Sequence, residues 1–444
     1  MTAASIGAER APHASGNAMA RRNAVTLAVA TGLAGANASV VFAAGALVGN
    51  WLSGDIGLAT LPTTLLVLGT ALSTYPIAYT ARHFGRRRAF LIGNIAGLVA
   101  GLTGAAAIYV GSFWLFCAGT FCAGLYHAVV SSYRYAAADT ATPAYRPKAI
   151  SWVLTGGIAS AIIGPQLVIW TQGANIQFLT DRLGLGLAVI LGSAAVDPHI
   201  VGWIETASVR FPYLFTFLAQ ALVAVAAMAV TRRFHDQPIE EVRGGTLRPF
   251  LQIAANSRFV VAVVTGTVAQ MLMNFVMTAA PLAMHLCGHS LTDSTLGIQW
   301  HIIGMFAPSF FTGGMITRFG KEQVAASGLA LLAVCAVVNL LGITVAHFWI
   351  GLALLGVGWN FAFISATAMI TDCHTPSERA MVQGFNDFVI FGTTACGSLL
   401  AGYVLSHAGW AVINAAIIPV VLGCVLLVLW VRSAPASRTT VAAE

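Results

Sequence analysis

The sequence is poor in charge, and this excludes most classes of soluble protein. Of its 444 residues only 8% are Asp, Glu, Lys or Arg, while 58% are hydrophobic. The mean hydropathy is +0.81. Soluble domains carry about 25% charged residues, because water must solvate their surfaces. A water-soluble fold is therefore excluded.

Signatures of metal binding and catalysis are also lacking. The 7 cysteines are scattered without metal-ligand spacing, so we interpret them as small packing residues. We find no paired metal ligands, nucleophile elbow or phosphate loop, and no basic groove for nucleic acid. We therefore expect a protein that is not an enzyme, with no cofactor, no metal and no nucleic-acid partner.

Long hydrophobic runs, in contrast, recur along the whole chain. A helix needs about 20 apolar residues to cross the hydrocarbon core, and only helices satisfy their backbone in lipid at this length. We expect twelve spans. They lie near 25–48, 57–81, 89–110, 112–136, 149–171, 211–230, 259–284, 294–316, 322–344, 348–371, 380–404 and 411–431.

The distribution of Lys and Arg predicts the orientation of these spans. An even number of spans places both termini on one side of the membrane. All 22 Lys and Arg except Arg182 and Arg210 fall on that side. Because cytoplasmic loops carry the excess of positive charge, we expect both termini in the cytoplasm. The net charge of +7 then reflects orientation and affinity for the membrane surface.

The connection after the fifth span is unusually long. Its apolar run Leu183–Val196 is short for a crossing, and a crossing there would destroy the charge asymmetry, so we expect an interfacial or re-entrant helix in an outside loop. The expected organisation is a cytoplasmic tail 1–24, a six-helix half 25–230 that includes the outside loop 172–210, a central cytoplasmic loop 231–258, a six-helix half 259–431 and a cytoplasmic tail 432–444.

The two halves repeat one plan. Residues 139–146 after the fourth span and 372–379 after the tenth both read D-x-x-x-P-x-x-R. At nearly the same offset, Phe-Gly-Arg at 84–86 after the second span corresponds to Phe-Gly-Lys at 319–321 after the eighth. Duplicated halves place a substrate site near the bilayer midplane between them, and access alternates as one half rocks against the other.

The loop after the second span resembles a signature of the major facilitator superfamily of transporters. That family carries Gly-x-x-x-Asp-Arg-x-Gly-Arg-Arg there, often with a weaker copy after helix eight. Residues 78–88 keep the later Gly and the basic run, but Arg82 replaces the acidic residue that helps latch the halves, so that role is not carried over. Gly85 permits a tight turn, and Arg86 either grips helix-end carbonyls or a carboxylate, or simply sets topology.

Four polar residues pair up between the halves near the midplane. Asn37 in the first span corresponds to Gln270 in the seventh, and His127 in the fourth to Asn360 in the tenth. His127 and Asn360 each lie about 18 Å from the end of their span, against a core of about 30 Å. In the family, helices one, four, seven and ten line the cavity. We favour a lining role over interhelical hydrogen bonds.

Aromatic residues flank these amides, and Tyr126 and Trp359 are also repeat mates. Rings beside amides suit a planar, hydrogen-bonding solute, although aromatics at helical spacing more often serve packing. The sequence shows no obvious central Arg or Lys, which disfavours strongly anionic solutes. The expected substrate-binding residues are Asn37, Tyr126, His127, Gln270, Trp359 and Asn360.

Asp387 is a carboxylate well inside a span. Such a group can take up a proton and couple transport to the proton gradient, and His127, which titrates near neutrality, is an equal candidate. The alternative is a structural ion pair between Asp387 and a cytoplasmic arginine. The expected coupling or gating residues are Gly85, Arg86, His127, Arg146, Arg379 and Asp387.

Three further stretches, 277–284, 356–361 and 383–387, resemble a bacterial subgroup of the superfamily that includes riboflavin transporters. The resemblance implies an all-α membrane protein with twelve transmembrane helices in two pseudo-repeats, located in the bacterial inner membrane. It implies uptake of riboflavin or a similar planar nutrient by a monomer in contact with lipid, with protons as a candidate coupling ion.

Two alternatives stay open. One is proton-coupled efflux of amphipathic drugs, because Gly164-Pro165 partly matches the motif of the superfamily's antiporters, although a structural hinge explains that motif equally well. The other is a membrane sensor built on a transporter scaffold.

Overall fold

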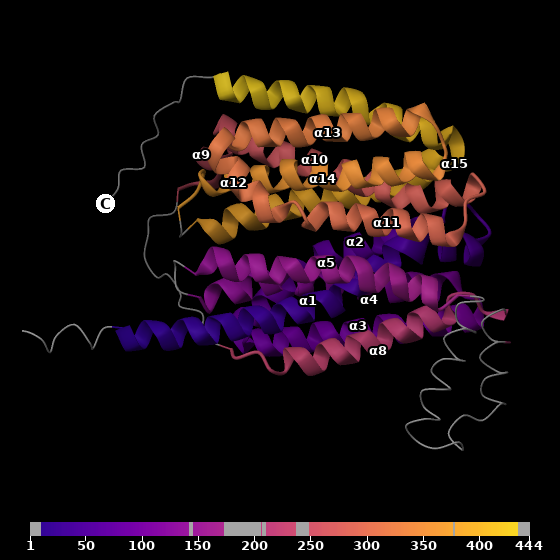
Figure 1. The fold of residues 1–444 in the computed structure, drawn as a ribbon, viewed down its shortest axis with the longest axis horizontal. Helices are drawn as coiled ribbons and strands as arrows, with labels where there is room; N and C mark the ends of the chain where they lie inside the picture. Colours follow the sequence, from indigo (N-terminus) through magenta and orange to yellow (C-terminus); the bar gives the residue numbers. More distant parts are fainter. Residues whose placement is uncertain are drawn as a thin grey trace, which may run out of the picture.

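The computed structural model describes residues 10–141, 145–172, 206, 210–236, 248–375 and 378–433. Every regular element in these ranges is a helix (Figure 1). Their bounds are α1 Arg10–Ser53, α2 Leu61–Phe84, α3 Arg86–Val110, α4 Phe113–Asp139, α5 Arg146–Trp170, α8 Leu214–Thr231, α9 Phe250–Ala254, α10 Ser257–Leu286, α11 Leu291–Phe306, α12 Ser309–Phe319, α13 Lys321–Leu341, α14 Val345–Thr371 and α15 Arg379–Ser433.

Ten of the described helices are long and apolar enough to cross a membrane. One of them, α15, supplies two spans, because its 55 residues are interrupted at Gly409, where φ is 79° and the backbone is not helical. A straight helix of that length would extend about 80 Å, far beyond a core of about 30 Å. Together α11 and α12 make one further span. The fold therefore agrees with the twelve helices expected from the sequence.

The eighth span, expected near 294–316, is formed by two helices, α11 and α12. Ala307 and Pro308, between α11 and α12, keep right-handed helical angles, but the ladder of backbone hydrogen bonds is interrupted there. Proline has no N–H for the helical ladder, and its ring clashes with the preceding turn, so a break there has a local cause.

Two turns show the repeat in the backbone itself. Gly85, between α2 and α3, has φ 88° and ψ 153°, and Gly320, between α12 and α13, has φ 91° and ψ 155°. Glycine adopts such angles without the steric cost that a Cβ would bring. The matching Phe-Gly-Arg and Phe-Gly-Lys stretches thus encode the same turn in both halves.

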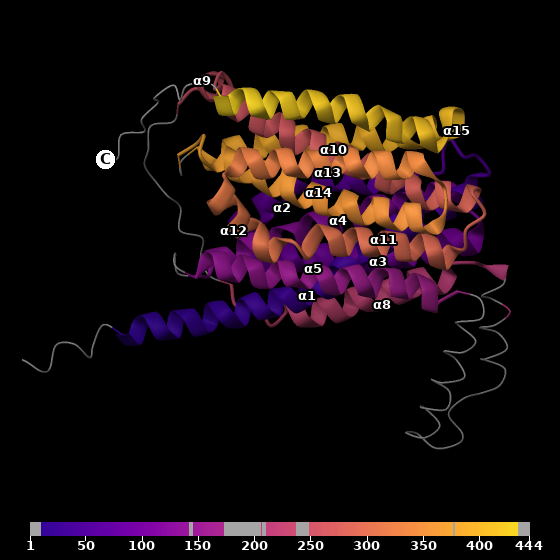
Figure 2. The same cartoon turned by 45° about the horizontal axis from the view of Figure 1, so that its top comes forward.

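The helices pack as two bundles. Helices α1 to α5 contact one another and α8, while α10 to α15 form a second bundle (Figures 1 and 2). Both ends of the described chain leave the molecule at the same end, on the left of Figure 1. We name this the charged end, defined by Arg86, Arg248 and Lys321, and the opposite end the far end. The expected outside loop 172–210 lies almost entirely outside the described residues, and its structure stays a prediction, as do the domain boundaries.

Small residues let the helices of the first bundle approach closely. A Cβ on Gly156 of α5 would lie 2.2 Å from the carbonyl oxygen of Ala28 on α1, and one on Gly164 would lie 2.5 Å from Cβ of Ser39. Close packing of α1 on α5 therefore requires these glycines. This supports the structural explanation for the stretch that ends in Gly164-Pro165.

The bundles meet tightly at the far end. Thr64 Oγ1 on α2 donates a hydrogen bond of 3.1 Å to Ser398 Oγ on α15. One turn further along α15, a Cβ on Gly402 would lie only 2.1 Å from Thr60 Oγ1. Residues 272–284, the far half of α10, are all buried. The space between the bundles is therefore closed at the far end.

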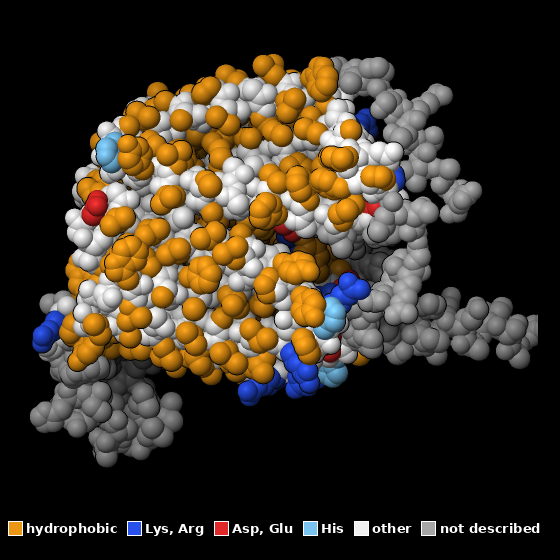
Figure 3. Space-filling model, turned by 180° about the vertical axis from the view of Figure 1, so that it is seen from behind, with side chains coloured by type: hydrophobic (Ala, Val, Ile, Leu, Met, Phe, Trp, Pro, Cys, Tyr) orange, Lys and Arg blue, Asp and Glu red, His pale blue; other side chains and the backbone are white. Residues whose placement is uncertain are grey.

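The charged end is open between the bundles. In the half of α10 that lies nearest the charged end, Val264, Val268 and Met271 are partly exposed. Their spacing places them on one face of the helix. Figure 3 shows the surface hollowed between the two bundles, toward the end where most Lys and Arg side chains gather. Among the described residues, the space between the bundles is therefore open at the charged end and closed at the far end.

The contact at Gly402 predicts a cost for any side chain there. We expect Gly402→Leu to destabilise this closed arrangement by about 1–3 kcal/mol, because an added side chain must displace Thr60. Thermal unfolding of the purified protein in detergent measures this. Gly392→Leu, on the same helix with nothing within 4 Å of the added Cβ, is the matched control. Equal melting temperatures for the two variants would contradict the close approach.

Candidate functional site

A stacked aromatic pair on α14 faces α10. The rings of Trp359 and Phe363 have centroids 4.9 Å apart and planes inclined by 15°. Both side chains are partly exposed. Trp359 Nε1 donates a hydrogen bond of 2.7 Å to Gln270 Oε1 on α10, which fixes the orientation of the indole. The two helices thus present a flat aromatic surface with an amide beside it.

Two of the expected midplane residues hold polar atoms without a partner among the described residues. Asn37 on α1 is 3% exposed, and neither its Nδ2 nor its Oδ1 makes a hydrogen bond. His127 Nδ1 on α4 is also buried without a partner. An unpaired buried polar group costs about 1–3 kcal/mol, so such groups are uncommon unless a ligand or water completes them. Asn37 and His127 therefore carry hydrogen-bonding atoms that no described residue satisfies.

Asn360 lies apart from this surface. Neighbouring residues on a helix project about 100° apart, so Trp359 and Asn360 face different neighbours. The Asn360 side chain is fully buried, and its amide donates a hydrogen bond to Met305 of the eighth span. Tyr126 is likewise buried within the first bundle, where its hydroxyl donates to Asn94 Oδ1 on α3 at 3.1 Å.

Opposite charges from the two bundles interact toward the charged end. Arg134 on α4 and Asp387 on α15 attract each other electrostatically, yet these two described residues do not form an ion pair. The Arg134 guanidinium lies 4.8 Å above the ring of Tyr135 and donates to its hydroxyl, and its Nε has no partner. Asp387 accepts a hydrogen bond of 3.3 Å from Asn386.

Arg134 was missed by sequence reasoning, which counted it among the topology charges because it lies close to the end of its span. The available signal was its spacing of seven from His127, which places both on one face of α4. The side chains of Arg146 and Arg379, the arginines expected to pair with Asp387 or to gate, lie outside the described residues.

An ion pair fixes the repeated turn in each bundle. Arg86, after Gly85, pairs with Asp139 at the end of α4. In the second bundle Lys321 Nζ lies 2.5 Å from Asp372 Oδ2 at the end of α14. The repeated D-x-x-x-P-x-x-R motifs therefore begin with the carboxylates that hold the repeated turns.

A carboxylate also reaches the first of these turns from elsewhere. Asp236, just after α8, accepts a hydrogen bond of 3.2 Å from the backbone N–H of Arg87 in the first turn of α3. A negative charge is favourable at a helix N-terminus. Asp236 thus brings an acidic group to a loop in which Arg82 stands at the family's acidic position.

A buried carboxylate anchors the start of α15. The Glu378 side chain is 0% exposed and accepts bonds of 2.7 Å from both Nε and Nη2 of Arg248. The backbone N–H groups of Arg248 and Thr375 donate to it as well. The hydrogen bonds from Arg248, together with those from the backbone, hold the pKa of Glu378 well below its ordinary value of 4.5.

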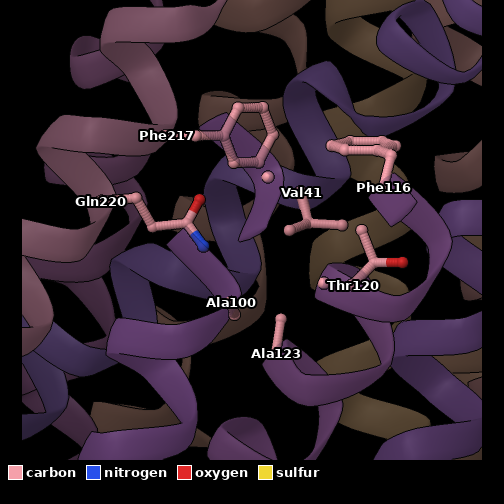
Figure 4. A pocket seen from close by; sticks show the side chains of 9 residues that line it. Val41, Ala100, Phe116, Thr120, Ala123, Phe217 and Gln220 are labelled. Atoms are coloured by element: carbon pink, nitrogen blue, oxygen red, sulfur yellow. The ribbon is translucent and has the colours of Figure 1, made fainter. Parts of the chain in front are cut away.

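A pocket inside the first bundle does not form a solute site. It lies between α1, α3, α4 and α8, where Gln220 and Phe217 approach Val41 and Thr120 (Figure 4). It leaves no room for a water molecule.

Comparison with known proteins decides the family. The model of the Major Facilitator Superfamily matches residues 262–444. The riboflavin transporter RfnT of Brucella anthropi is 44% identical over 419 residues, which cover 94% of this chain and 97% of that protein. The chain belongs to the major facilitator superfamily. It is a multi-pass membrane transporter, as the resemblance in its loops implied.

Other relatives agree with this assignment. The uncharacterized MFS-type transporter YddS of Bacillus subtilis is 29% identical over 87% of both chains. The xylose transporter XylE of E. coli, in a partially occluded inward open conformation, superimposes with a TM-score of 0.65 over 93% of this chain and 97% of its own. The human organic anion transporter MFSD10 gives 0.60 over 92% and 99%. Both solved structures are 13% identical in sequence, so they show the shared fold alone.

The Glu378 anchor predicts a pH dependence of stability. Because its pKa is lower in the folded state, its contribution is complete above its ordinary value of 4.5 and is lost as the pH falls through the folded pKa. We expect Glu378→Gln to lower the melting temperature at pH 7, with the difference from wild type shrinking as the pH falls below that value. Thermal unfolding in detergent measures this. A difference that stays constant with pH would contradict the anchor.

Proposed function

We propose that this transporter imports riboflavin, or a closely similar planar nutrient, across the bacterial inner membrane by alternating access. The observation that carries the proposal is the stacked pair of Trp359 and Phe363, with the indole fixed by Gln270, in a chain similar to a riboflavin transporter over nearly its whole length. A flavin ring is planar, and its polar edge needs hydrogen-bonding partners. An aromatic face beside amides suits both properties.

We assign solute binding to Asn37, His127, Gln270 and Trp359. Trp359 stacks on the ring, and Asn37 and His127 supply unpaired hydrogen-bonding atoms from the first bundle. Binding would thus draw on α1 and α4 of one bundle and on α10 and α14 of the other. In this proposal Tyr126 and Asn360, whose polar groups bond within the protein, support these helices without touching the solute.

The charged end is the cytoplasmic end in this proposal, and both termini lie in the cytoplasm. Support comes from the positive-inside rule, because Arg210 is the sole described Lys or Arg at the far end. The structure would then be open to the cytoplasm. Rocking the bundles together at that end brings Arg134 toward Asp387, so this pair would close the cytoplasmic side. Asp387 and His127 are the candidate groups for proton coupling.

Efflux of amphipathic drugs is the competing function, and transport direction separates the two. We expect flavin-auxotrophic cells expressing the chain to take up labelled riboflavin saturably, and sensitivity to a protonophore would indicate drive by the proton gradient. Absence of uptake despite confirmed membrane expression would reject riboflavin import, and efflux of amphipathic dyes would then be measured.

Replacing Trp359 tests the site. We expect Trp359→Ala to weaken apparent riboflavin affinity about tenfold at unchanged membrane abundance, because the stacking surface is lost. Trp359→Phe keeps a ring but loses the bond to Gln270 and should lie between this variant and wild type. Trp114→Ala, at a position 69% exposed on the outside of α4, is the matched control. Normal riboflavin uptake by the Trp359→Ala variant would contradict the proposed binding site.

A charge exchange tests the gate. We expect Arg134→Asp and Asp387→Arg each to abolish transport. The double variant should regain exchange of labelled for unlabelled riboflavin, with a coupling free energy between the two residues of about 1–3 kcal/mol. Exchange needs no gradient, so rescue of exchange without rescue of uptake would indicate that Asp387 also carries the proton. No rescue of either activity would show that the two residues do not act as a pair.

A further inference from the structure

The eighth span contains an interruption that the proposed transport function does not explain. α11 ends at Phe306, and α12 begins at Ser309 after Pro308. In lipid, carbonyl groups freed by such a break must be satisfied by other parts of the protein. The partner here is a side chain from the neighbouring helix α14.

Asn360 bonds to both sides of the break. Its Nδ2 donates to the Met305 carbonyl oxygen at 2.6 Å and to Ser309 Oγ at 2.7 Å, and its Oδ1 accepts from Thr312 Oγ1 at 2.6 Å. Met305 lies four residues before Ser309, so its carbonyl is one that an unbroken helix would pair with the Ser309 N–H. Asn360 therefore replaces part of the missing helical ladder and ties both segments to α14.

Few other contacts hold α12. Thr312, the residue bonded to Asn360, is the one buried side chain of this described helix. A Cβ on Gly313 or Gly314 would meet nothing within 4 Å, and Phe310 and Phe311 are 64% and 53% exposed. α11, in contrast, buries seven residues, from Ser294 to Gly304. Phe311 also makes an edge contact with the ring of Phe361 on α14, with centroids 6.2 Å apart. α12 is thus packed more lightly than α11.

α12 lies where the two bundles face each other. α12 contacts α5 of the first bundle toward the charged end (Figures 1 and 2). Just before the break, the ring of Phe306 packs on Gly157 of α5, where a Cβ would come within 2.7 Å. Movement of α12 about the break would therefore change the opening at the charged end while α11 keeps its contacts.

We propose that α12 is a hinged half-helix that swings about Ala307 and Pro308 to open and close the charged end, and that Asn360 is the positioning residue of this hinge. Asn360 holds the freed carbonyl and limits how far α12 departs from α14. It acts on turnover through α12, and it does not bind the solute.

Hydrogen exchange of the purified full-length protein tests the hinge without any ligand. We expect backbone amides of 309–319 to exchange at least about tenfold faster than those of 294–304. Asn360→Asp, which removes both Nδ2 bonds, should speed exchange in 309–319 further, whereas Pro308→Ala, which permits a continuous helix, should slow it. Asn339→Asp, at a buried asparagine that bonds to Asn414 elsewhere in this bundle, and Pro419→Ala are the matched controls.

Transport supplies the second readout, and this readout rests on the proposed riboflavin import. Both Asn360→Asp and Pro308→Ala should lower maximal uptake about fivefold or more, while riboflavin binding, followed by its fluorescence, changes less than about twofold. Unchanged exchange in 309–319 in both variants overturns the hinge. A loss of affinity that matches the loss of uptake in Asn360→Asp overturns it as well, because it would make Asn360 a solute ligand.

If Asn360→Asp does not fold, Pro308→Ala carries the test on its own. If the wild-type protein does not bind riboflavin, the import proposal fails, and hydrogen exchange still decides whether α12 is hinged.

Discussion

Hydrogen bonds in a medium without water are the constraint on which this structure depends. Lipid offers no partner for a backbone N–H or C=O, so each helix must satisfy its own ladder or find a side chain that does. Most spans meet this requirement through their regular geometry. Where the ladder is interrupted, at Pro308, the fully buried Asn360 donates a hydrogen bond to one freed carbonyl, that of Met305. Asn37 and His127 keep unpaired atoms, as do other buried side chains among the described residues, such as Tyr133 and Gln220.

The two ends of the molecule are built from different interactions. At the far end the bundles approach through small and hydroxyl side chains, such as Gly402 against Thr60 and Thr64 against Ser398. Such contacts form at short range and leave little space. At the charged end, ion pairs hold elements within each bundle, as Arg86 does with Asp139, while Arg134 and Asp387 stay unjoined across the gap. Contacts between bundles can thus be exchanged while each bundle keeps its own fixed turns.

The sequence predicted the fold well, because long apolar runs and positive charges respond directly to the membrane. The repeat of Phe-Gly-Arg and Phe-Gly-Lys even located matching turns. Side-chain direction was harder to predict. Trp359 and Asn360 share a midplane height, but helix rotation turns one toward α10 and the other toward α11, and a linear pattern does not show which. Arg134 was assigned to topology because it lies near the end of its span, and the linear sequence does not show that Asp387 of α15 lies within its electrostatic reach.

The carboxylate at the first repeated turn comes from outside the motif that forms the turn. Asp236 reaches Arg87 from 149 residues further along the chain, beside a loop in which arginine has replaced the family's acidic residue. The turn thus has an acidic group beside it, although a distant segment of the chain provides that group. A motif that lacks its acidic residue in the sequence can therefore still have a carboxylate next to it once the chain is folded.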